Sequence, residues 1–112
     1  MAVFKLARYE IRSDHRADAE RAMHDLASYV RKELPASSWS TYRDPHAPAH
    51  YLSLSRADDR AADDRYREAP GMQAFLAAIG PLLVGTVEIT EYELVTSSDL
   101  APRLRTRRRR PR

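Results

Sequence analysis

The stretch that most constrains the fold is residues 86–95, the longest uninterrupted run of strand-forming residue types in the chain. Side chains alternate between the two faces of a strand, so apolar residues that serve one core keep a period of two. Here Val87 and Ile89 share one face, whereas Tyr92 and Leu94 fall on the opposite face. We therefore expect the last strand of a small sheet that is covered on both sides. The chain's own helices would cover one side and a second copy of the chain the other.

Two alternatives remain open for this strand. A bulge near residues 90–91 would re-aim the strand and so account for the change of phase. Alternatively, the segment is an ordinary edge strand whose Glu88, Glu91 and Glu93 lie in water.

The rest of the chain supplies the other elements of such a sheet. We predict strands over residues 3–11, 38–43 and 50–56, a helix between Ser13 and Pro35, and two helical segments, 57–69 and the stripe within 72–79. Pro70 and Gly71 separate the helical segments, and the two prolines of 44–49 exclude that connector from the ladder. The order βαββαβ is typical of the ferredoxin-like fold, an α+β fold with helices on one face of a four-stranded antiparallel sheet.

The helical segments differ in how they are expected to lie. An apolar stripe marks the buried side of the first helix: Ala19, Ala22, Met23, Leu26, Val30 and Leu34. The 57–69 segment is dense in charge and is predicted to be solvated, with an ion pair between Asp63 and Arg67. The first strand has apolar residues on both faces, which favours a sheet that is buried on two sides.

Composition excludes several classes of site. The chain has no cysteine, so disulfides, thiol nucleophiles and cysteine-ligated metals are absent. No apolar run is long enough for a membrane span, and charges interrupt the N-terminal residues, so we expect a cytoplasmic protein without a signal peptide. Seven of the 19 Lys and Arg residues lie in residues 103–112, which leaves 12 against 16 acidic residues in the rest of the chain. We expect one domain over 1–97 and a disordered, arginine-rich tail over 98–112.

Three stretches carry a resemblance to a known family. They are Thr-Tyr-Arg-Asp at 41–44, Tyr-Arg-Glu-Ala-Pro-Gly-Met-Gln-Ala-Phe-Leu at 66–76, and Val-Glu-Ile-Thr-Glu-Tyr-Glu-Leu-Val at 87–95. With the element order, they make the chain similar to the antibiotic biosynthesis monooxygenase (ABM) family of the dimeric α+β barrel superfamily. The resemblance implies a homodimer with a pocket in each subunit between sheet and helices. Members of this family include cofactor-free oxygenases of aromatic polyketides, quinol oxygenases and heme-degrading enzymes.

The chain departs from the residues that such enzymes commonly use. It has no asparagine, and the end of the third strand, where a tryptophan is frequent, reads Ser-Arg-Ala at 55–57. Tyr66 stands just before the Pro-Gly-Met-Gln-Ala-Phe segment, where the resemblance would place a histidine. The family's catalytic set therefore does not carry over, and heme degradation is the activity that these departures weaken most.

Two residues are candidates for catalysis. The phenol of Tyr66 could hydrogen-bond a phenolic or quinone oxygen or help move a proton; otherwise it packs its ring on the core with its hydroxyl in water. Arg8 could contact an anionic or enolate oxygen; otherwise it forms an ion pair near the end of the sheet. Arg8 shares its strand face with Phe4 and Leu6.

Four further residues are candidates for substrate binding: Trp39, His50, Tyr51 and Phe75. The only tryptophan, Trp39, could stack on an aromatic ligand or anchor the core or the dimer. His46 and His50 lack a third ligand in a recognisable pattern, so no metal site is predicted.

These observations lead to two functional hypotheses. The first is a cytoplasmic homodimer that inserts oxygen into a small aromatic phenol or quinol without a metal, flavin or other cofactor. The second is a non-catalytic binding or accessory protein on the same scaffold. Membrane association is not expected. Nucleic-acid binding through the tail is not expected either, because the tail has no aromatic residues for stacking.

Overall fold

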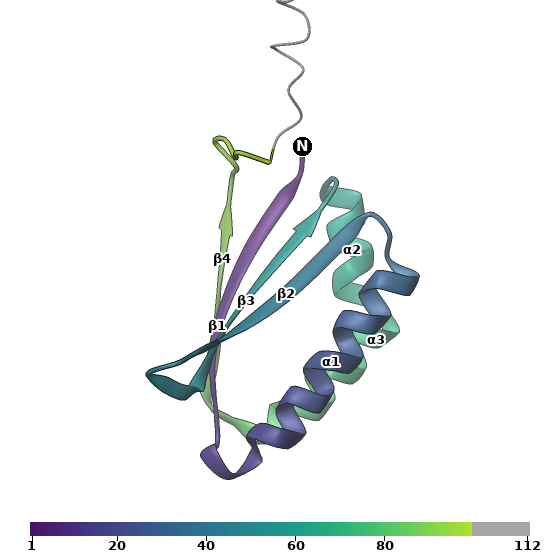
Figure 1. The fold of residues 1–112 in the computed structure, drawn as a ribbon. Coiled ribbons are helices and arrows are strands. Elements are labelled where there is room, and N and C mark those ends of the chain that lie inside the picture. Colours follow the sequence, from purple (N-terminus) through teal and green to yellow (C-terminus); the bar gives the residue numbers. More distant parts are fainter. Residues whose placement is uncertain (100–112) are drawn as a thin grey trace, which may run out of the picture.

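The computed structural model describes residues 1–99, which form a four-stranded sheet and a layer of helices (Figure 1). The elements in chain order are β1 (Val3–Ile11), the 3-10 turn η1 (Ser13–His15), α1 (Arg16–Glu33), β2 (Ser37–Asp44), β3 (Ala47–Ala57), α2 (Arg60–Glu68), α3 (Pro70–Ile79), the 3-10 turn η2 (Gly80–Leu82) and β4 (Leu83–Tyr92). Apart from residues 98 and 99, the predicted tail lies outside the described residues.

The strands pair in the order β2-β3-β1-β4, and every neighbouring pair is antiparallel. All three α-helices cover one face of the sheet, while the other face is left open in the single chain (Figure 1). The predicted ferredoxin-like α+β fold is confirmed. None of the helices among the described residues is long and apolar enough to cross a membrane.

The odd-numbered residues of β1 point toward the helices. Tyr9 and Ile11 are buried there, next to Met23 and Leu26 of α1 and Phe75 of α3. The stripe predicted for the first helix is largely confirmed, with Ala19, Met23, Leu26 and Val30 buried. The core of the subunit therefore lies between the sheet and the helices, as the periodicity predicts.

The two long helices approach each other closely at Gly71. A Cβ at this position would lie 2.3 Å from the ring of Tyr29 on α1. Pro70 occupies the first position of α3, where its missing amide costs no helical hydrogen bond. The Pro-Gly pair thus ends α2, starts α3 and lets α3 pack against α1.

The irregularity in the last strand is not where the sequence placed it. Arg8 pairs with Glu88, but Glu10 pairs with Val84, so three residues of β4 lie opposite Tyr9 alone. Gly85 adopts a φ of 75°, a conformation that glycine reaches without steric cost. The alternative of a bulge near 90–91 is therefore wrong, because pairing from Glu88 to Tyr92 is regular.

The apolar residues of β4 do divide between the two faces without a change of phase. Val87 packs against the core on the helix side, whereas Tyr92 pairs with Phe4 on the open side. Strand β4 lies at one edge of the sheet, and Glu88 and Glu91 are exposed, as the edge-strand alternative has it. The carboxylate of Glu91 is also bound by Arg60, at 2.6 Å.

The hairpin between β2 and β3 is tighter than predicted. Asp44 pairs with Ala47 and the Asp44 carboxylate accepts a 2.8 Å hydrogen bond from the His46 amide, which closes the turn. The connector 44–49 was predicted to stay outside the ladder, yet Pro48 lies within β3. The register shifts between Arg43 and Asp44, so residues 48–50 have no partner on β2 and the missing amide of Pro48 interrupts no regular pairing.

The prediction of a solvated helix over 57–69 is wrong for one side of α2. Asp63 and Tyr66 are buried, and Asp59 caps the helix by accepting a 2.8 Å hydrogen bond from the Ala62 amide. Ala57 belongs to β3 rather than to the helix. The predicted pair of Asp63 and Arg67 is present, at 3.4 Å. Burial of Asp63 is possible because the ammonium of Lys5 on β1 also binds its carboxylate.

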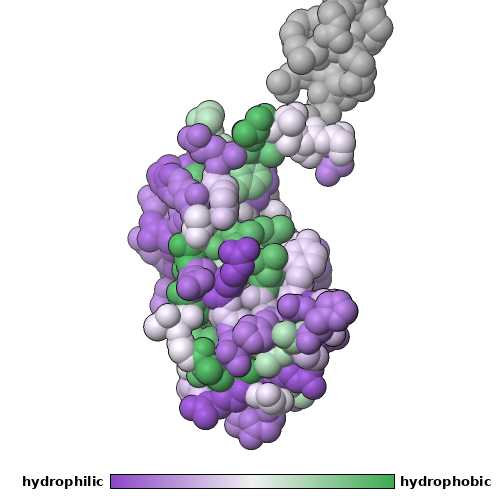
Figure 2. All heavy atoms as spheres, turned by 90° about the vertical axis from the view of Figure 1, so that its left-hand side faces the viewer, coloured by the Kyte–Doolittle hydropathy of each residue, from purple (hydrophilic) through white to green (hydrophobic). Residues whose placement is uncertain are grey.

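The open face of the sheet is partly apolar. Figure 2 shows hydrophobic side chains along this face with hydrophilic ones among and around them. The apolar residues that alternate onto it include Phe4, Leu6, Leu52, Leu54 and Tyr92. Leu54 and Tyr92 remain 42% and 50% exposed in the single chain.

Candidate functional site

A cavity of about 280 Å³ lies between the sheet and the helix layer. Its walls come from all four strands and from α2 and α3, and the residues that contribute are mostly apolar. They are Lys5, Ala7, Tyr9, Trp39, Ser53, Ser55, Tyr66, Arg67, Met72, Phe75, Leu76, Ile79, Val87 and Ile89. This position, between sheet and helices, is where the family resemblance led us to expect a pocket.

The aromatic wall of the cavity is formed by Trp39 and Phe75. Their rings meet edge to face with centroids 5.6 Å apart, which joins β2 to α3 across the cavity. Phe75 is buried and Trp39 is half-buried. A planar ring in the cavity would therefore contact aromatic carbon on this side.

The floor of the cavity carries the hydroxyls of Tyr9 and Ser53, which are hydrogen-bonded to each other and, through Ser53, to Thr41 on β2. Thr41 donates to the Leu52 carbonyl at 3.3 Å, and Ser53 donates to Thr41 at 3.0 Å. The Tyr9 hydroxyl lies 2.9 Å from that of Ser53, so its proton completes the chain. Each of these hydroxyls thus spends its one proton within the protein.

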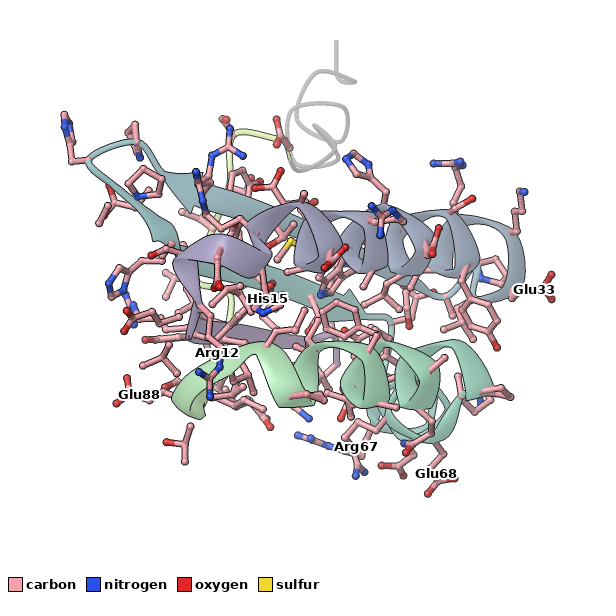
Figure 3. All side chains as sticks on the ribbon, turned by 90° about the horizontal axis from the view of Figure 1, so that it is seen from below. Arg12, His15, Glu33, Arg67, Glu68 and Glu88 are labelled. Atoms are coloured by element: carbon pink, nitrogen blue, oxygen red, sulfur yellow. The ribbon has the colours of Figure 1, made fainter. Side chains whose placement is uncertain are left out.

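The end of the cavity near α2 is polar. Lys5 on β1 lies opposite Ser55 on β3 in the sheet register, and Tyr66 of α2 lines the same end. The Lys5 ammonium donates a 2.8 Å hydrogen bond to Asp63, whose side chain is only 3% exposed and which lies one turn before Tyr66 on α2. Figure 3 shows Arg67 projecting from α2 on the side away from α1.

The tyrosines of the cavity are held in the protonated form. Burial raises the pKa of Tyr66 far above its usual range, and the neighbouring Ser55 hydroxyl opposes this only in part. Burial also raises the pKa of Tyr9, against the hydrogen bonds from Ser53 and Thr41. At neutral pH the Tyr66 hydroxyl can donate a hydrogen bond to a ligand, whereas the Tyr9 proton is used on Ser53. Neither residue can accept a proton from a ligand.

The structure brings together three of the six predicted site residues. Tyr66, Trp39 and Phe75 line the cavity. Arg8 and His50 lie instead at a hollow on the open face beside the β2–β3 hairpin, where His50 is 3.8 Å from Glu10.

Tyr51 lies between these two groups. Its ring stacks on that of Tyr9 with centroids 5.8 Å apart, and its hydroxyl donates to Glu20 of α1 at 2.7 Å. Burial and the Glu20 carboxylate raise the pKa of Tyr51 to about 12. Tyr51 therefore packs against the Tyr9 ring and helps to hold it in position.

Sequence reasoning missed Lys5, Asp63 and Ser55. Lys5 shares its strand face with Ala7 and Tyr9, so period-two alternation alone could have placed it on the helix side. Asp63 gave no such signal, because its partner Lys5 lies 58 residues away. Within residues 1–99 no group of three potential ligands could hold a metal ion.

The fold recurs among solved structures. No protein-family profile matches this sequence, and no curated protein matches it. Rv0793 from Mycobacterium tuberculosis superimposes with a TM-score of 0.78 and 21% identity, over 88% of this chain and 99% of that one. A candidate antibiotic biosynthesis monooxygenase from Caulobacter crescentus gives 0.80 and 21%, over 85% and 91%.

A third structure is named by its activity. A mutant of SnoaB, a cofactor-independent oxygenase from Streptomyces nogalater, superimposes with a TM-score of 0.74 and 17% identity, over 88% of this chain and 98% of that one. Several neighbours carry the name antibiotic biosynthesis monooxygenase, so the predicted resemblance is confirmed at the level of the fold.

Proposed function

We propose that this chain binds a small aromatic phenol or quinol between its sheet and helices and catalyses oxygenation of that ring by dioxygen, without a metal or flavin. The observation that carries the proposal is the cavity itself, which is lined mostly by apolar residues and has hydrogen-bond donors at one end. Its volume lies near the lower end of the ~300–1,000 Å³ of ligand pockets. This favours a compact ring system over a large polycycle.

The reaction needs little from the protein. A deprotonated phenol or anthrone can itself pass an electron to dioxygen, after which the two radicals combine. For an anthrone, the methylene carbon loses two hydrogens and gains one oxygen atom as a ketone, and the second oxygen atom leaves as water. The protein then has to orient the ring, exclude water and stabilise the anion.

The residues of the cavity match these tasks. Trp39 and Phe75 would hold the ring, and the protonated Tyr66 would donate a hydrogen bond to its oxygen. Arg8 lies on the other face of the sheet, so we give it no role at this cavity.

The same proposal includes a homodimer. The open face carries exposed apolar side chains, among them Leu54 and Tyr92, and a hollow of about 450 Å³. A second copy packed face to face would remove these groups from water.

Oxygen uptake tests the proposed reaction. Purified protein is mixed with a phenolic anthrone or a naphthohydroquinone, and uptake is compared with the autoxidation rate. We expect uptake above that rate, lowered at least about tenfold in Tyr66→Phe and unchanged in Tyr29→Phe, which removes a phenol on α1 outside the cavity. Uptake at the autoxidation rate would refute the enzyme.

One observation favours a second function. Within the described residues the cavity lining includes no carboxylate and no imidazole, so no residue there is suited to take a proton from the ligand. A non-catalytic protein that binds or sequesters an aromatic pathway intermediate needs no such residue. Saturable binding of the same compounds without oxygen uptake would identify this role.

A further inference from the structure

The polar end of the cavity has the composition of a site for an oxygen anion. The ammonium of Lys5 and the hydroxyls of Ser55 and Tyr66 lie there, and the Arg67 guanidinium, which is paired with Asp63 and Asp64, borders the cavity as well. Lys5 and Ser55 face each other across β1 and β3, and Tyr66 comes from the helix above them. The remaining cavity wall is mostly aromatic and aliphatic, so charge at this end acts in a poorly solvated space.

The Lys5 ammonium is fixed in place. Its side chain is 19% exposed and its Nζ lies 2.8 Å from the carboxylate of Asp63. An ammonium has three protons, so one bond to Asp63 leaves donors for a ligand. A group held in this way loses little further freedom when a ligand binds.

No acidic side chain near Lys5 neutralises the charge of its ammonium alone. Asp63 is shared, because Arg60 and Arg67 approach the same oxygen at 3.8 and 3.4 Å. Glu91 on β4, the other acid near Lys5 in the register, is bound by Arg60 at 2.6 Å. From α3 the cavity receives Met72, Phe75, Leu76 and Ile79, none of which titrates.

The choice of lysine also stands out in this sequence. Of the 19 basic residues only Lys5 and Lys32 are lysines. A compact ammonium fits a narrow space and can point one proton at Asp63 and another at a ligand, whereas a planar guanidinium pairs best side-on with one carboxylate.

We propose that Lys5, with Ser55 and Tyr66, binds the oxygen of the aromatic ligand as phenolate, and that the site thereby promotes ionisation of a phenol without a base. The proton leaves to bulk water. Asp63 acts as the positioning residue for Lys5. The inference deepens the function proposed above and rests on it, since it takes the cavity to be the site of a phenol.

The test uses a phenol that reports its own ionisation. 4-Nitrophenol changes its absorption when it ionises, and 4-nitroanisole, its methyl ether, cannot ionise. Each is titrated with the full-length protein, and the ionisation constant of bound 4-nitrophenol is measured by absorption against pH. An opposite charge within ~4–6 Å lowers the pKa of an acid by 1–3 units, so we expect at least about a tenfold rise in that constant.

Three variants separate charge from structure. Lys5→Met removes the ammonium and is expected to abolish the rise while 4-nitroanisole still binds. The Lys5→Met/Asp63→Asn double variant leaves no uncompensated carboxylate and is expected to behave in the same way, which keeps the test valid should the single variant unfold. Lys32→Met, at an exposed lysine on α1, is the matched control and is expected to match the unmodified chain.

The outcomes distinguish this inference from the proposed function. Binding of both probes with an unchanged ionisation constant, or a rise that persists in the double variant, overturns the inference and leaves the cavity as a phenol site. Failure of both probes to bind overturns the phenol site and the inference together. A rise in the ionisation constant that depends on Lys5, without oxygen uptake, supports the inference and refutes the oxygenase.

Discussion

The indole ring of Trp39 on β2 meets the phenyl ring of Phe75 on α3 edge to face, with their centroids 5.6 Å apart. These rings are 36 positions apart in the sequence, and their contact closes one wall of the cavity. Because Trp39 is the only tryptophan, its fluorescence reports on this wall alone. Several properties of the molecule can be measured through this contact and through those around it.

Binding of an aromatic ligand is expected to change Trp39 emission. A nitroaromatic such as 4-nitroanisole would contact the indole directly in the cavity and quench it with a saturable dependence on concentration. Titration of free N-acetyltryptophanamide gives the collisional background. A linear, unsaturable response equal to that background would show that the ligand does not reach the cavity.

Truncation of Phe75 is expected to be costly, because the ring is buried against several core residues. Phe75→Ala is predicted to lower the free energy of unfolding by ~3–5 kcal/mol, measured by urea denaturation. Leu76→Ala is the matched control on the next residue of α3, where the side chain is 47% exposed, and it is predicted to cost under ~1 kcal/mol. Equal losses in both variants would contradict the burial of Phe75.

The close approach of Gly71 to Tyr29 predicts that alanine has different effects on stability at Gly71 and at Gly80. Gly71→Ala places a methyl group 2.3 Å from the Tyr29 ring and is predicted to destabilise the fold by ~1–3 kcal/mol. Gly80→Ala meets no atom within 4 Å at a residue with helical dihedrals, so it is predicted to be neutral or stabilising by up to ~1 kcal/mol. Thermal melts of the two alanine variants make the comparison directly, and reversed signs would contradict the packing of α3 on α1.

The Glu20 carboxylate predicts a pH dependence of stability. The hydrogen bond from Tyr51 and then the Arg43 guanidinium, 2.5 Å away, lower the pKa of Glu20 below its ordinary value. A lowered pKa in the folded state stabilises the fold above the ordinary pKa of glutamate, ~4.3. That stability is lost as the pH falls through the acidic range below it.

The variant Glu20→Gln tests this dependence. It is expected to be less stable at neutral pH and to lose less stability on acidification below about pH 5, as followed by urea denaturation at a series of pH values. Glu33→Gln, which removes an exposed carboxyl at the end of α1, controls for the loss of one charge. A profile for Glu20→Gln that runs parallel to the unmodified chain would contradict the role of Glu20.

Self-association is expected to depend on the open face of the sheet. Light scattering on eluted protein is predicted to give the mass of a dimer for the unmodified chain and of a monomer for Leu54→Arg, which places a charge among apolar residues of that face. Leu76→Arg, at a leucine of similar exposure on the helix side, is predicted to remain a dimer. A monomer for the unmodified chain at micromolar concentration would refute the proposed homodimer.

Prediction from the sequence was strongest where periodicity decides the outcome. The apolar stripe predicted from Ala19 to Leu34 is buried as far as Val30, because a helix turns one side to the core at every third or fourth residue. The alternation of the strands likewise predicts which of their residues face the helices. The prediction that Pro48 lies outside the sheet was wrong. A proline interrupts strand pairing only where its missing amide would have donated a hydrogen bond, and Pro48 has no partner on β2. Asp63 was predicted to be exposed because it is charged. Its burial depends on the ion pair with Lys5, which no local sequence pattern encodes.

The hydroxyls of Tyr9, Ser53 and Thr41 use all their protons on one another and on a backbone carbonyl. A flat ligand above them therefore finds no free hydrogen-bond donor on this part of the floor and could slide or turn over. Its orientation must come from one end of the cavity, so the regioselectivity of any reaction here would be decided by whichever substituent is anchored at that end.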